Sequence, residues 1–169
     1  FYMQKISIKT IVVTGTNGKS TACSLIQHIL KTKRLDVQLG GNIGRPILDL
    51  KIKKKTIVII EASSFQLEYT KFIKPNFAAI LNISNDHLDW HKTMTNYKNS
   101  KFKIFSKQDG NDIALINKQK LIGIFKKKNY LSKLKITKKN LLSSEIKKKI
   151  TNNYLLAEPN LENLILAYE

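Results

Sequence analysis

Five short apolar runs are spaced along the chain, and they predict buried strands. The runs at 55–60 and 77–82 are apolar without alternation, which is typical of strands covered on both faces. Similar runs lie at 9–13, 36–39 and 112–117. We therefore expect these strands to belong to one buried sheet.

Segments with helical spacing lie between these runs. From residue 20 to residue 30, apolar side chains recur at the spacing of one helix face, which predicts an amphipathic helix. The stretch 95–107 has a similar pattern, and a further helix is predicted to begin near Asn160, directly after Pro159. Strands that alternate with helices favour an α/β fold, with a mostly parallel P-loop-type sheet flanked by helices.

Residues 118–150 depart from this alternation. The segment holds twelve lysines and one acidic residue, Glu145, with short apolar pieces such as "LIGIF" between them. Because runs of charge are usually solvated surfaces, we expect a less regular and exposed region here. A small antiparallel sheet within 118–155 is the regular structure that we consider for it.

The composition is that of one globular domain. The chain has 169 residues, 42% of them hydrophobic, which is enough for a sizeable core. No apolar run approaches the roughly 20 residues of a membrane helix, and the first ten residues lack the apolar region of a signal peptide. The single cysteine, Cys23, excludes an internal disulfide and a cysteine-based zinc site. We expect a cytoplasmic monomer that does not associate with membranes.

The formal net charge of +18 permits two interpretations. A strongly basic surface can bind nucleic acid. However, Arg34 and Arg45 are the only arginines, and few aromatic residues lie among the lysine runs, whereas nucleic-acid-binding proteins usually use arginine and stacking aromatics. We favour a compositional bias toward Lys, Asn and Ile, and expect no nucleic-acid partner.

Glycine, small polar, acidic or imidazole side chains follow four of the predicted strands. These strand exits are residues 14–21, 40–44, 61–64 and 83–87. A parallel sheet binds its ligands at the carboxyl ends of its strands. Four such exits together predict one functional site along that edge.

The first exit, "TGTNGKST", has the composition of a phosphate-binding loop. Gly15 and Gly18 leave room for phosphate oxygens, and the helix N-terminus directs positive dipole at an anion. Lys19 can reach the terminal phosphates of a nucleotide, and the Ser20 hydroxyl can ligate Mg²⁺. The common motif has glycine where this chain has Val13, and a turn that merely caps the helix is the alternative. The predicted ATP-binding residues of this loop are Gly15, Thr16, Asn17, Gly18, Lys19, Ser20 and Thr21.

Three further side chains are candidates for this site. Glu61 ends an apolar strand and is a natural Mg²⁺ ligand, although an exposed strand-end acid would have the same sequence. His87 lies in "NDH" at another strand exit and could contact metal or substrate, with Asp86 as its partner and His91 as a weaker candidate. Lys101 lies on an apolar helix face, where a lysine usually extends to solvent, so residue chemistry alone does not select it.

Five segments together resemble the central ATP-binding domain of the Mur ligases, the ATP-dependent amino-acid ligases of bacterial peptidoglycan assembly. They are "TGTNGKST", "GGNIG", "EASSFQLE", "LNISNDHLDWH" and "YKNSKFKIF". A loop without the first glycine is the form found in that family, which accounts for Val13. The resemblance covers 9–117 and returns at 160–169, whereas 118–159 resembles no known segment.

The resemblance implies a role for each matched residue. Lys19 corresponds to the lysine that holds ATP phosphates, and Ser20 and Glu61 to ligands of the ATP-bound Mg²⁺. His87 corresponds to a ligand of a second Mg²⁺ that also meets the substrate. Lys101 corresponds to a lysine that the family carbamylates to support that metal, so Lys19, His87 and Lys101 are the implied catalytic residues.

Other matched residues are implied to bind substrate and adenine. Asn42 corresponds to a residue that contacts the UDP-muramoyl substrate, and Ser63 is assigned to the same substrate. Asn160 and Asn163 keep the spacing of an adenine-binding pair, although Pro159 replaces the usual histidine before them.

The resemblance implies an amide-forming ligase that uses ATP and two Mg²⁺ ions. "GGNIG" and "SSFQLE" are most similar to the members that add D-glutamate to UDP-N-acetylmuramoyl-L-alanine through an acyl phosphate. The alternatives are another ligase of the superfamily, including folylpolyglutamate synthase, a basic P-loop module that binds nucleotide or nucleic acid, or an inactive relic.

The same resemblance defines a domain organisation. Residues 1–169 correspond to a central ATP-binding domain that is incomplete at its C-terminal end. The family's N-terminal UDP-binding domain and C-terminal amino-acid-binding domain are absent from this sequence. We therefore expect the chain alone to be inactive as a ligase.

Overall fold

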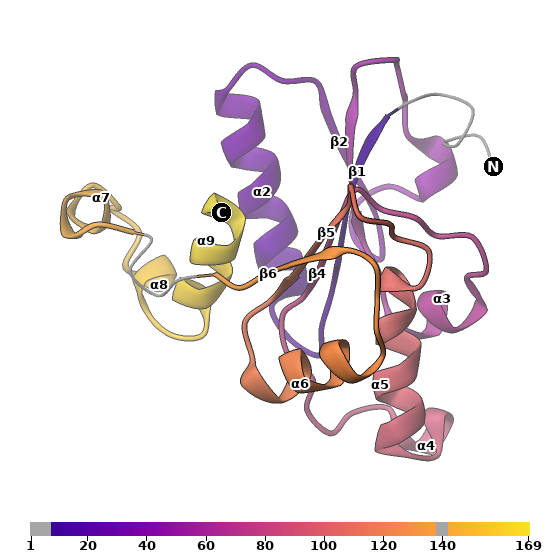
Figure 1. Ribbon diagram of the computed structural model, residues 1–169. Helices are drawn as coiled ribbons and strands as arrows, with labels where there is room; N and C mark the ends of the chain where they lie inside the picture. Colours follow the sequence, from indigo (N-terminus) through magenta and orange to yellow (C-terminus); the bar gives the residue numbers. More distant parts are fainter. Residues whose placement is uncertain (1–7, 138–141) are drawn as a thin grey trace.

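The computed structural model describes residues 8–137 and 142–169 and contains a six-stranded sheet (Figure 1). The strands lie in the order β2-β3-β1-β4-β5-β6, and each neighbouring pair is parallel. They are β1 (Lys9–Thr14), β2 (Val37–Gly41), β3 (Ile57–Glu61), β4 (Phe77–Ile80), β5 (Ile113–Ile116) and β6 (Lys133–Lys135). The five predicted strands are confirmed, and the carboxyl ends of all six strands point toward the same edge of the sheet.

Helices connect the strands and confirm the predicted α/β alternation. They are α2 (Lys19–Thr32), α3 (Ser64–Tyr69), α4 (Leu88–His91), α5 (Met94–Phe102), α6 (Gln119–Lys127), α7 (Ser144–Lys148), α8 (Asn153–Leu156) and α9 (Asn160–Tyr168), with 3-10 turns η1 (Ile47–Asp49) and η2 (Lys103–Phe105). The three predicted helices correspond to α2, to α5 with η2, and to α9. Within the two described ranges, no helix is long and apolar enough to cross a membrane.

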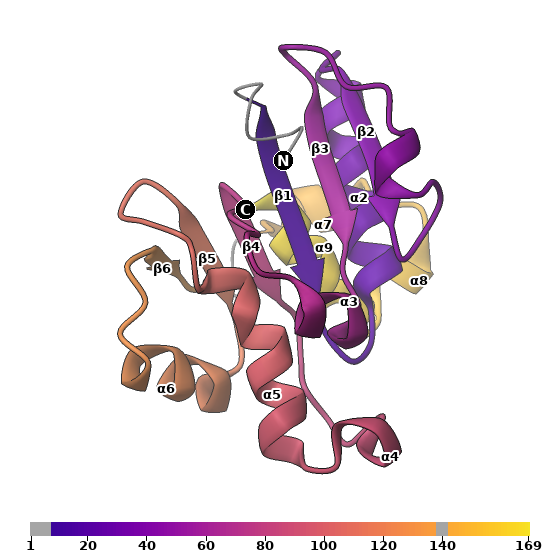
Figure 2. The ribbon, with the colours of Figure 1, turned by 90° about the vertical axis from the view of Figure 1, so that its right-hand side faces the viewer.

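The sheet is the middle layer of three (Figures 1 and 2). Helices α2 and α9 cover one face, where Cys23 and Leu166 belong to the same apolar cluster. Helices α3, α5 and α6 cover the other face, where Phe102 and Phe125 are buried. Burial raises the pKa of the Cys23 thiol to about 12, so this cysteine is a small packing residue rather than a reactive one.

Strand β1 explains why the apolar runs do not alternate. Val12 belongs to the cluster beneath α3, α5 and α6, whereas Val13 belongs to the cluster beneath α2 and α9. Successive strand side chains point to opposite faces, so a strand covered on both faces has no solvated position.

The segment 118–155 differs from the sequence prediction. Its described part contains no antiparallel sheet; instead, α6 covers the sheet and β6 pairs in parallel with β5. Leu121, Ile122 and Phe125 recur at helical spacing and are buried, so "LIGIF" is part of a helix. A helix between two strands makes a parallel crossover, which an antiparallel pair does not require. Residues 138–141 lie outside the described part of the chain.

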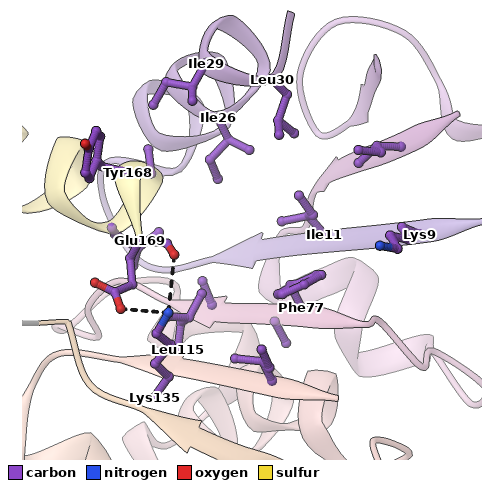
Figure 3. Close-up of a pocket in the computed structure, with 16 residues that line it drawn as sticks. Lys9, Ile11, Ile26, Ile29, Leu30, Phe77, Leu115, Lys135, Tyr168 and Glu169 are labelled. Atoms are coloured by element: carbon purple, nitrogen blue, oxygen red, sulfur yellow. Dashed lines mark hydrogen bonds and ion pairs between the residues drawn. The ribbon is translucent and has the colours of Figure 1, made fainter. Parts of the chain in front are cut away.

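An apolar groove of about 360 Å³ lies between α2, α9 and the sheet (Figure 3). Lys9 and Phe77, at the starts of β1 and β4, line it together with Ile26 of α2. An ion pair of 2.7 Å between Lys135 and Glu169 lies at its border. None of the described residues that line the groove is a predicted site residue, so the groove is distinct from the site that parallel topology predicts at the carboxyl ends of the strands.

Gly41, which ends β2, is expected to tolerate no side chain. Its φ is +107°, and a Cβ there would lie 2.3 Å from the backbone oxygen of Glu61. We expect Gly41→Ala to reduce the free energy of unfolding by about 2–4 kcal/mol, because the strain and the clash both involve backbone. Denaturant unfolding of the purified chain measures this loss.

Gly123 provides the matched control with the opposite sign. It is exposed in the middle of α6, and a Cβ there would meet nothing within 4 Å. Gly123→Ala should raise the free energy of unfolding by about 0.5–1 kcal/mol, since alanine loses less backbone entropy in a helix. Equal stability of the Gly41→Ala variant and the parent chain would contradict the described course of β2 beside β3.

Candidate active site

The loop after β1 is held against the exit of β4. The Thr16 N–H donates to the Asn82 carbonyl at 3.0 Å, and the Asn17 N–H donates to Asn82 Oδ1 at 2.9 Å. Gly18 caps α2 with a φ of +82°, which an L side chain rarely adopts. The loop therefore has the glycine-dependent turn and the helix N-terminus that an anion site requires.

Lys19 begins α2 and folds back over this loop. Its Nζ donates to the carbonyl oxygens of Gly15 at 3.0 Å and Thr16 at 2.8 Å. Ser20 and Thr21 follow in the first turn of α2, where Ser20 is exposed. The Lys19 ammonium lies inside the loop, where a phosphate would bind, and the Ser20 hydroxyl lies beside it, where Mg²⁺ would bind. Binding of phosphate and Mg²⁺ by these two residues remains a prediction.

Glu61 ends β3 with its carboxylate buried; only 2% of the residue is exposed. One oxygen, Oε1, accepts a hydrogen bond of 3.0 Å from Asn42 Nδ2, and the Asn42 N–H donates to the Glu61 carbonyl. The other oxygen, Oε2, is buried without a hydrogen-bond partner among the described residues. A buried carboxylate oxygen in this state is suited to a cation, because burial of an unpaired charge is otherwise costly.

The candidate metal ligands do not form a complete metal site by themselves. The described residues, 8–137 and 142–169, contain no group of three or more His, Cys, Asp or Glu side chains that could hold a metal ion. The set of Ser20, Glu61 and His87 offers one hydroxyl, one carboxylate and one imidazole. Mg²⁺ binds nucleotide sites through few protein ligands and completes its shell with phosphates and water, so Ser20 and Glu61 suit a nucleotide-bound Mg²⁺, and His87 is the ligand predicted for a second ion.

Lys101 of α5 is buried beneath the loop and does not extend to solvent, as a lysine on an apolar helix face usually does. Only 2% of the residue is exposed, and Nζ donates to the Gly15 carbonyl at 2.9 Å and lies 3.5 Å from Thr14 Oγ1. Nζ also lies 4.7 Å from the centre of the Tyr97 ring. These contacts satisfy the amine inside the fold. Burial, with a smaller contribution from the nearby Lys19 ammonium, lowers the pKa of Lys101 to about 7.

Tyr97 connects several parts of the site, although the sequence pattern did not indicate a role for it. Its hydroxyl lies 3.0 Å from Thr16 Oγ1, and Thr16 Oγ1 also accepts from the Ser84 N–H at 3.0 Å. Tyr97 thus joins α5 to the first and fourth strand exits. The only sequence signal was its position one helical turn before Lys101, which places both residues on one face.

His87 and Ser63 lie at the beginnings of two short helices. His87 is the N-cap of α4 with a φ of +54°, and its Nε2 lies 3.4 Å from Asp86 Oδ2, as expected of the proposed partner. Its side chain is exposed, and its ring centre lies 4.9 Å from that of Phe65. Ser63 is the N-cap of α3 and forms a capping box with Gln66, so its hydroxyl stabilises the helix.

The asparagines of α9 are both buried, and one lies against the loop. A Cβ at Gly18 would lie 2.6 Å from Asn163 Nδ2, so the Asn163 amide directly covers Gly18. Asn160 Nδ2 donates instead to the Tyr154 carbonyl at 3.2 Å. Helix α9 therefore brings Asn163 to the phosphate loop from a distant part of the sequence, whereas Asn160 holds α8 to α9.

A family model matches residues 13–166 of this chain: the Mur ligase middle domain. The chain belongs to the Mur ligase family. The matched range includes 118–159, where the motifs alone showed no resemblance, so nearly the whole described fold lies within the Mur ligase domain.

Several curated relatives of this Mur ligase domain are named UDP-N-acetylmuramoylalanine–D-glutamate ligase. The protein of Nitratidesulfovibrio vulgaris (strain DP4) is 46% identical over 107 residues, which cover 62% of this chain and 25% of that protein. The protein of Wolbachia pipientis wMel is 49% identical over 108 residues (64% and 20%), and that of Alkaliphilus oremlandii (strain OhILAs) is 41% identical over 131 residues (73% and 29%). The chain spans about a quarter of the length of these relatives.

Solved structures with this fold include other ligases. MurF ligase from Thermotoga maritima in complex with ADP has a TM-score of 0.61 at 22% identity, covering 78% of this chain and 33% of that chain. E. coli FolC in complex with DHPP and ADP has a TM-score of 0.52 at 15% identity, covering 75% and 42%. At these identities the likeness establishes the Mur ligase fold alone.

The predicted residues of this Mur ligase domain meet at one edge of the sheet. Lys19 and Lys101 donate to the same carbonyl, that of Gly15, and β1 and β3 place Val13 opposite Glu61. The arrangement brings two lysine side chains and one buried carboxylate to the exits of adjacent strands. It is the convergence that the strand exits predicted.

Proposed function

We propose that this Mur ligase domain binds Mg·ATP and provides the ATP site of a ligase that adds D-glutamate to UDP-N-acetylmuramoyl-L-alanine. The observation that carries the proposal is the meeting of Gly15, Lys19, Glu61 and Lys101 in a chain of this family. The choice of D-glutamate is supported by the names of the relatives that are 41–49% identical. We further propose that the chain acts as a monomer in the cytoplasm, where ATP is available.

The proposed reaction brings one anion against another. The L-alanyl carboxylate attacks the γ-phosphorus of ATP, which forms an acyl phosphate and releases ADP. The amine of D-glutamate then attacks the acyl carbon, phosphate leaves, and the new amide loses a proton. The protein must therefore offset negative charge and align the reacting groups.

Residues of the phosphate loop are suited to the first of these tasks. Lys19 Nζ now donates to the carbonyls of its own loop, and it would exchange them for phosphate oxygens when nucleotide binds. The N-terminus of α2 adds its dipole in the same direction. Asn163, whose amide lies against Gly18, would contact the adenine base.

Mg²⁺, when bound, would supply positive charge that lowers the repulsion between carboxylate and phosphate. Ser20 and Glu61 would hold the ion at the nucleotide, and His87 would hold a second. Lys101 would add CO₂ through its neutral amine, losing a proton and becoming an anionic carbamate that supports the second site. Asn42, through its bond to Glu61, would link the acceptor substrate to the metal.

Nucleotide binding is the direct test of the ATP site. Isothermal titration of the 169-residue chain with ADP, with and without Mg²⁺, should give saturable binding that weakens about 10-fold or more when Mg²⁺ is chelated. GMP at the same concentration is the control for binding of any anion by a basic protein. Binding that depends on salt but not on Mg²⁺ or on the nucleotide would contradict the proposal.

A chimaera tests whether the site supports the reaction. The matched 107-residue segment of the Nitratidesulfovibrio vulgaris relative is replaced by the corresponding segment of this chain. We expect ADP release that requires both UDP-N-acetylmuramoyl-L-alanine and D-glutamate. A folded chimaera that binds Mg·ADP and yet releases none in the presence of both substrates would contradict the ligase assignment.

A further inference from the structure

His91 is buried although it ends the one-turn helix α4 at the protein surface. It is 4% exposed, and its Nε2 lies 2.9 Å from the Oγ of Ser64, which is 2% exposed. A ring nitrogen of histidine and a hydroxyl can share one hydrogen bond, in which either group is the donor. A buried bond between two polar side chains fixes the relative position of the elements that carry them.

Three helices meet at His91. Ser64 is the first residue of α3, and the His91 carbonyl accepts a hydrogen bond of 2.9 Å from Asn96 Nδ2 of α5. The His91 ring centre lies 5.1 Å from that of Tyr97 and 5.6 Å from that of Phe65. His91 therefore contacts the helix that follows Glu61 and the helix that carries Lys101.

His91 is also joined directly to His87. The His91 N–H donates to the His87 carbonyl at 3.0 Å, which closes the single turn of α4. His87 has a φ of +54°, a conformation that costs energy in a residue other than glycine. Such a conformation persists only where neighbouring contacts hold it. Ring contacts of Trp90 with Phe65 also hold this turn against α3, and the bond between His91 and Ser64 adds a buried hydrogen bond at its far end.

We propose that His91 is a positioning residue: its bond to Ser64 holds His87 at a fixed place relative to the strand end that carries Glu61. Ser64 lies three positions after Glu61, so the bond connects the third and fourth strand exits. In this role His91 contacts neither nucleotide nor metal. The importance of placing His87 rests on the proposed function, whereas the placement itself is a property of the fold.

Histidine signals in an NMR spectrum test the placement without any ligand. The chain has three histidines: His28 on α2, His87 and His91. In the folded protein, the Phe65 ring 4.9 Å away should shift the ε1 proton of His87 from its position in the urea-unfolded chain. In Ser64→Ala, which removes the hydroxyl and leaves every ring in place, this proton should move toward the unfolded position. The exposed His28 should not move and serves as the internal control.

Two variants of His91 separate positioning from packing. His91→Gln places an amide nitrogen where Nε2 lies and should keep the parent signal of His87. His91→Phe keeps a ring but has no hydrogen-bonding nitrogen, and should lose that signal. If His91→Phe kept the parent signal of His87 and His91→Gln lost it, His91 would act by packing and the proposal would be overturned. An unchanged His87 signal in Ser64→Ala would also overturn the proposal. If both His91 variants fail to fold, Ser64→Ala decides the question alone.

A second measurement connects the placement to the proposed function. Ser64→Ala should weaken about 10-fold the binding of the second Mg²⁺, which His87 would hold, when Mg²⁺ is titrated into the chain in the presence of saturating Mg·ADP, as loss of groups that orient metal ligands commonly does. Absence of ADP binding in the parent chain would overturn the proposed function and leave the NMR result standing. A normal affinity for the second Mg²⁺ together with a displaced His87 signal would overturn the functional part of this inference.

Discussion

Lys19→Ala is expected to weaken binding of a non-hydrolysable Mg·ATP analogue to this chain about 100-fold or more. Lys19 Nζ lies within hydrogen-bond distance of the Gly15 and Thr16 carbonyls, which places an ammonium inside the phosphate loop. A hydrogen bond to a charged group contributes about 1.5–3 kcal/mol, and a charge-assisted contact to phosphate is among the stronger ones, which corresponds to a loss of about 10- to 100-fold or more in affinity. Isothermal titration of parent and variant measures the change, and circular dichroism verifies that the fold is kept.

Lys31→Ala is the matched control for this prediction. Lys31 lies in the last turn of the same helix and is exposed, so its removal changes the net charge equally without altering the loop. Its variant should bind the analogue within about 2-fold of the parent chain, because exposed charges at this distance are screened by salt. Equal losses in both variants would mean that net charge, and not the loop, binds the nucleotide.

Lys101→Met should stabilise the chain, and by more at pH 6 than at pH 10. The ordinary pKa of lysine is 10.5, and burial lowers that of Lys101 to about 7 in the folded protein. Below pH 7 the amine is protonated in both states, and the folded state has the full cost of a buried charge. Between pH 7 and 10.5 the unfolded chain binds more protons, so the free energy of unfolding of the parent rises with pH. The shift corresponds to a difference on the order of a few kcal/mol.

Denaturant unfolding at several pH values, in buffer free of CO₂, measures this difference. Lys98→Met is the control, since it removes a lysine from the same helix without removing the buried amine. A constant difference between Lys101→Met and the parent from pH 6 to pH 10 would show that the amine is not buried as described. A lysine that lowers stability is expected where function requires it.

The elements that the sequence predicted share one feature: their signal is local. The unalternating runs of β3 and β4 and the helical spacing of α2 depend only on neighbouring residues, and all three form as expected. Strand β6 has three residues, two of them lysines, and carries no such signal. It forms because α6 returns the chain beside β5, which is a property of the crossover rather than of the strand.

The residues of the site also divide into those with a local sequence signal and those without one. Glycines, Lys19, Glu61 and His87 were recognisable because each follows a strand, and parallel topology carries strand exits to one edge. Lys101 was selected only by resemblance, and Tyr97 and the bond between His91 and Ser64 were not predicted. Their roles arise from contacts across 27 to 86 positions of sequence.

By itself, the sequence determined that this chain forms a parallel α/β sheet with a glycine-containing loop at its edge, because periodicity and glycine placement act over a few residues. Only the tertiary structure decided that Lys101 lies beneath the loop, that Glu61 has a buried oxygen without a partner, and that Asn163 covers Gly18. The burial of a polar group depends on which distant segments surround it, and no local pattern of residues encodes those neighbours.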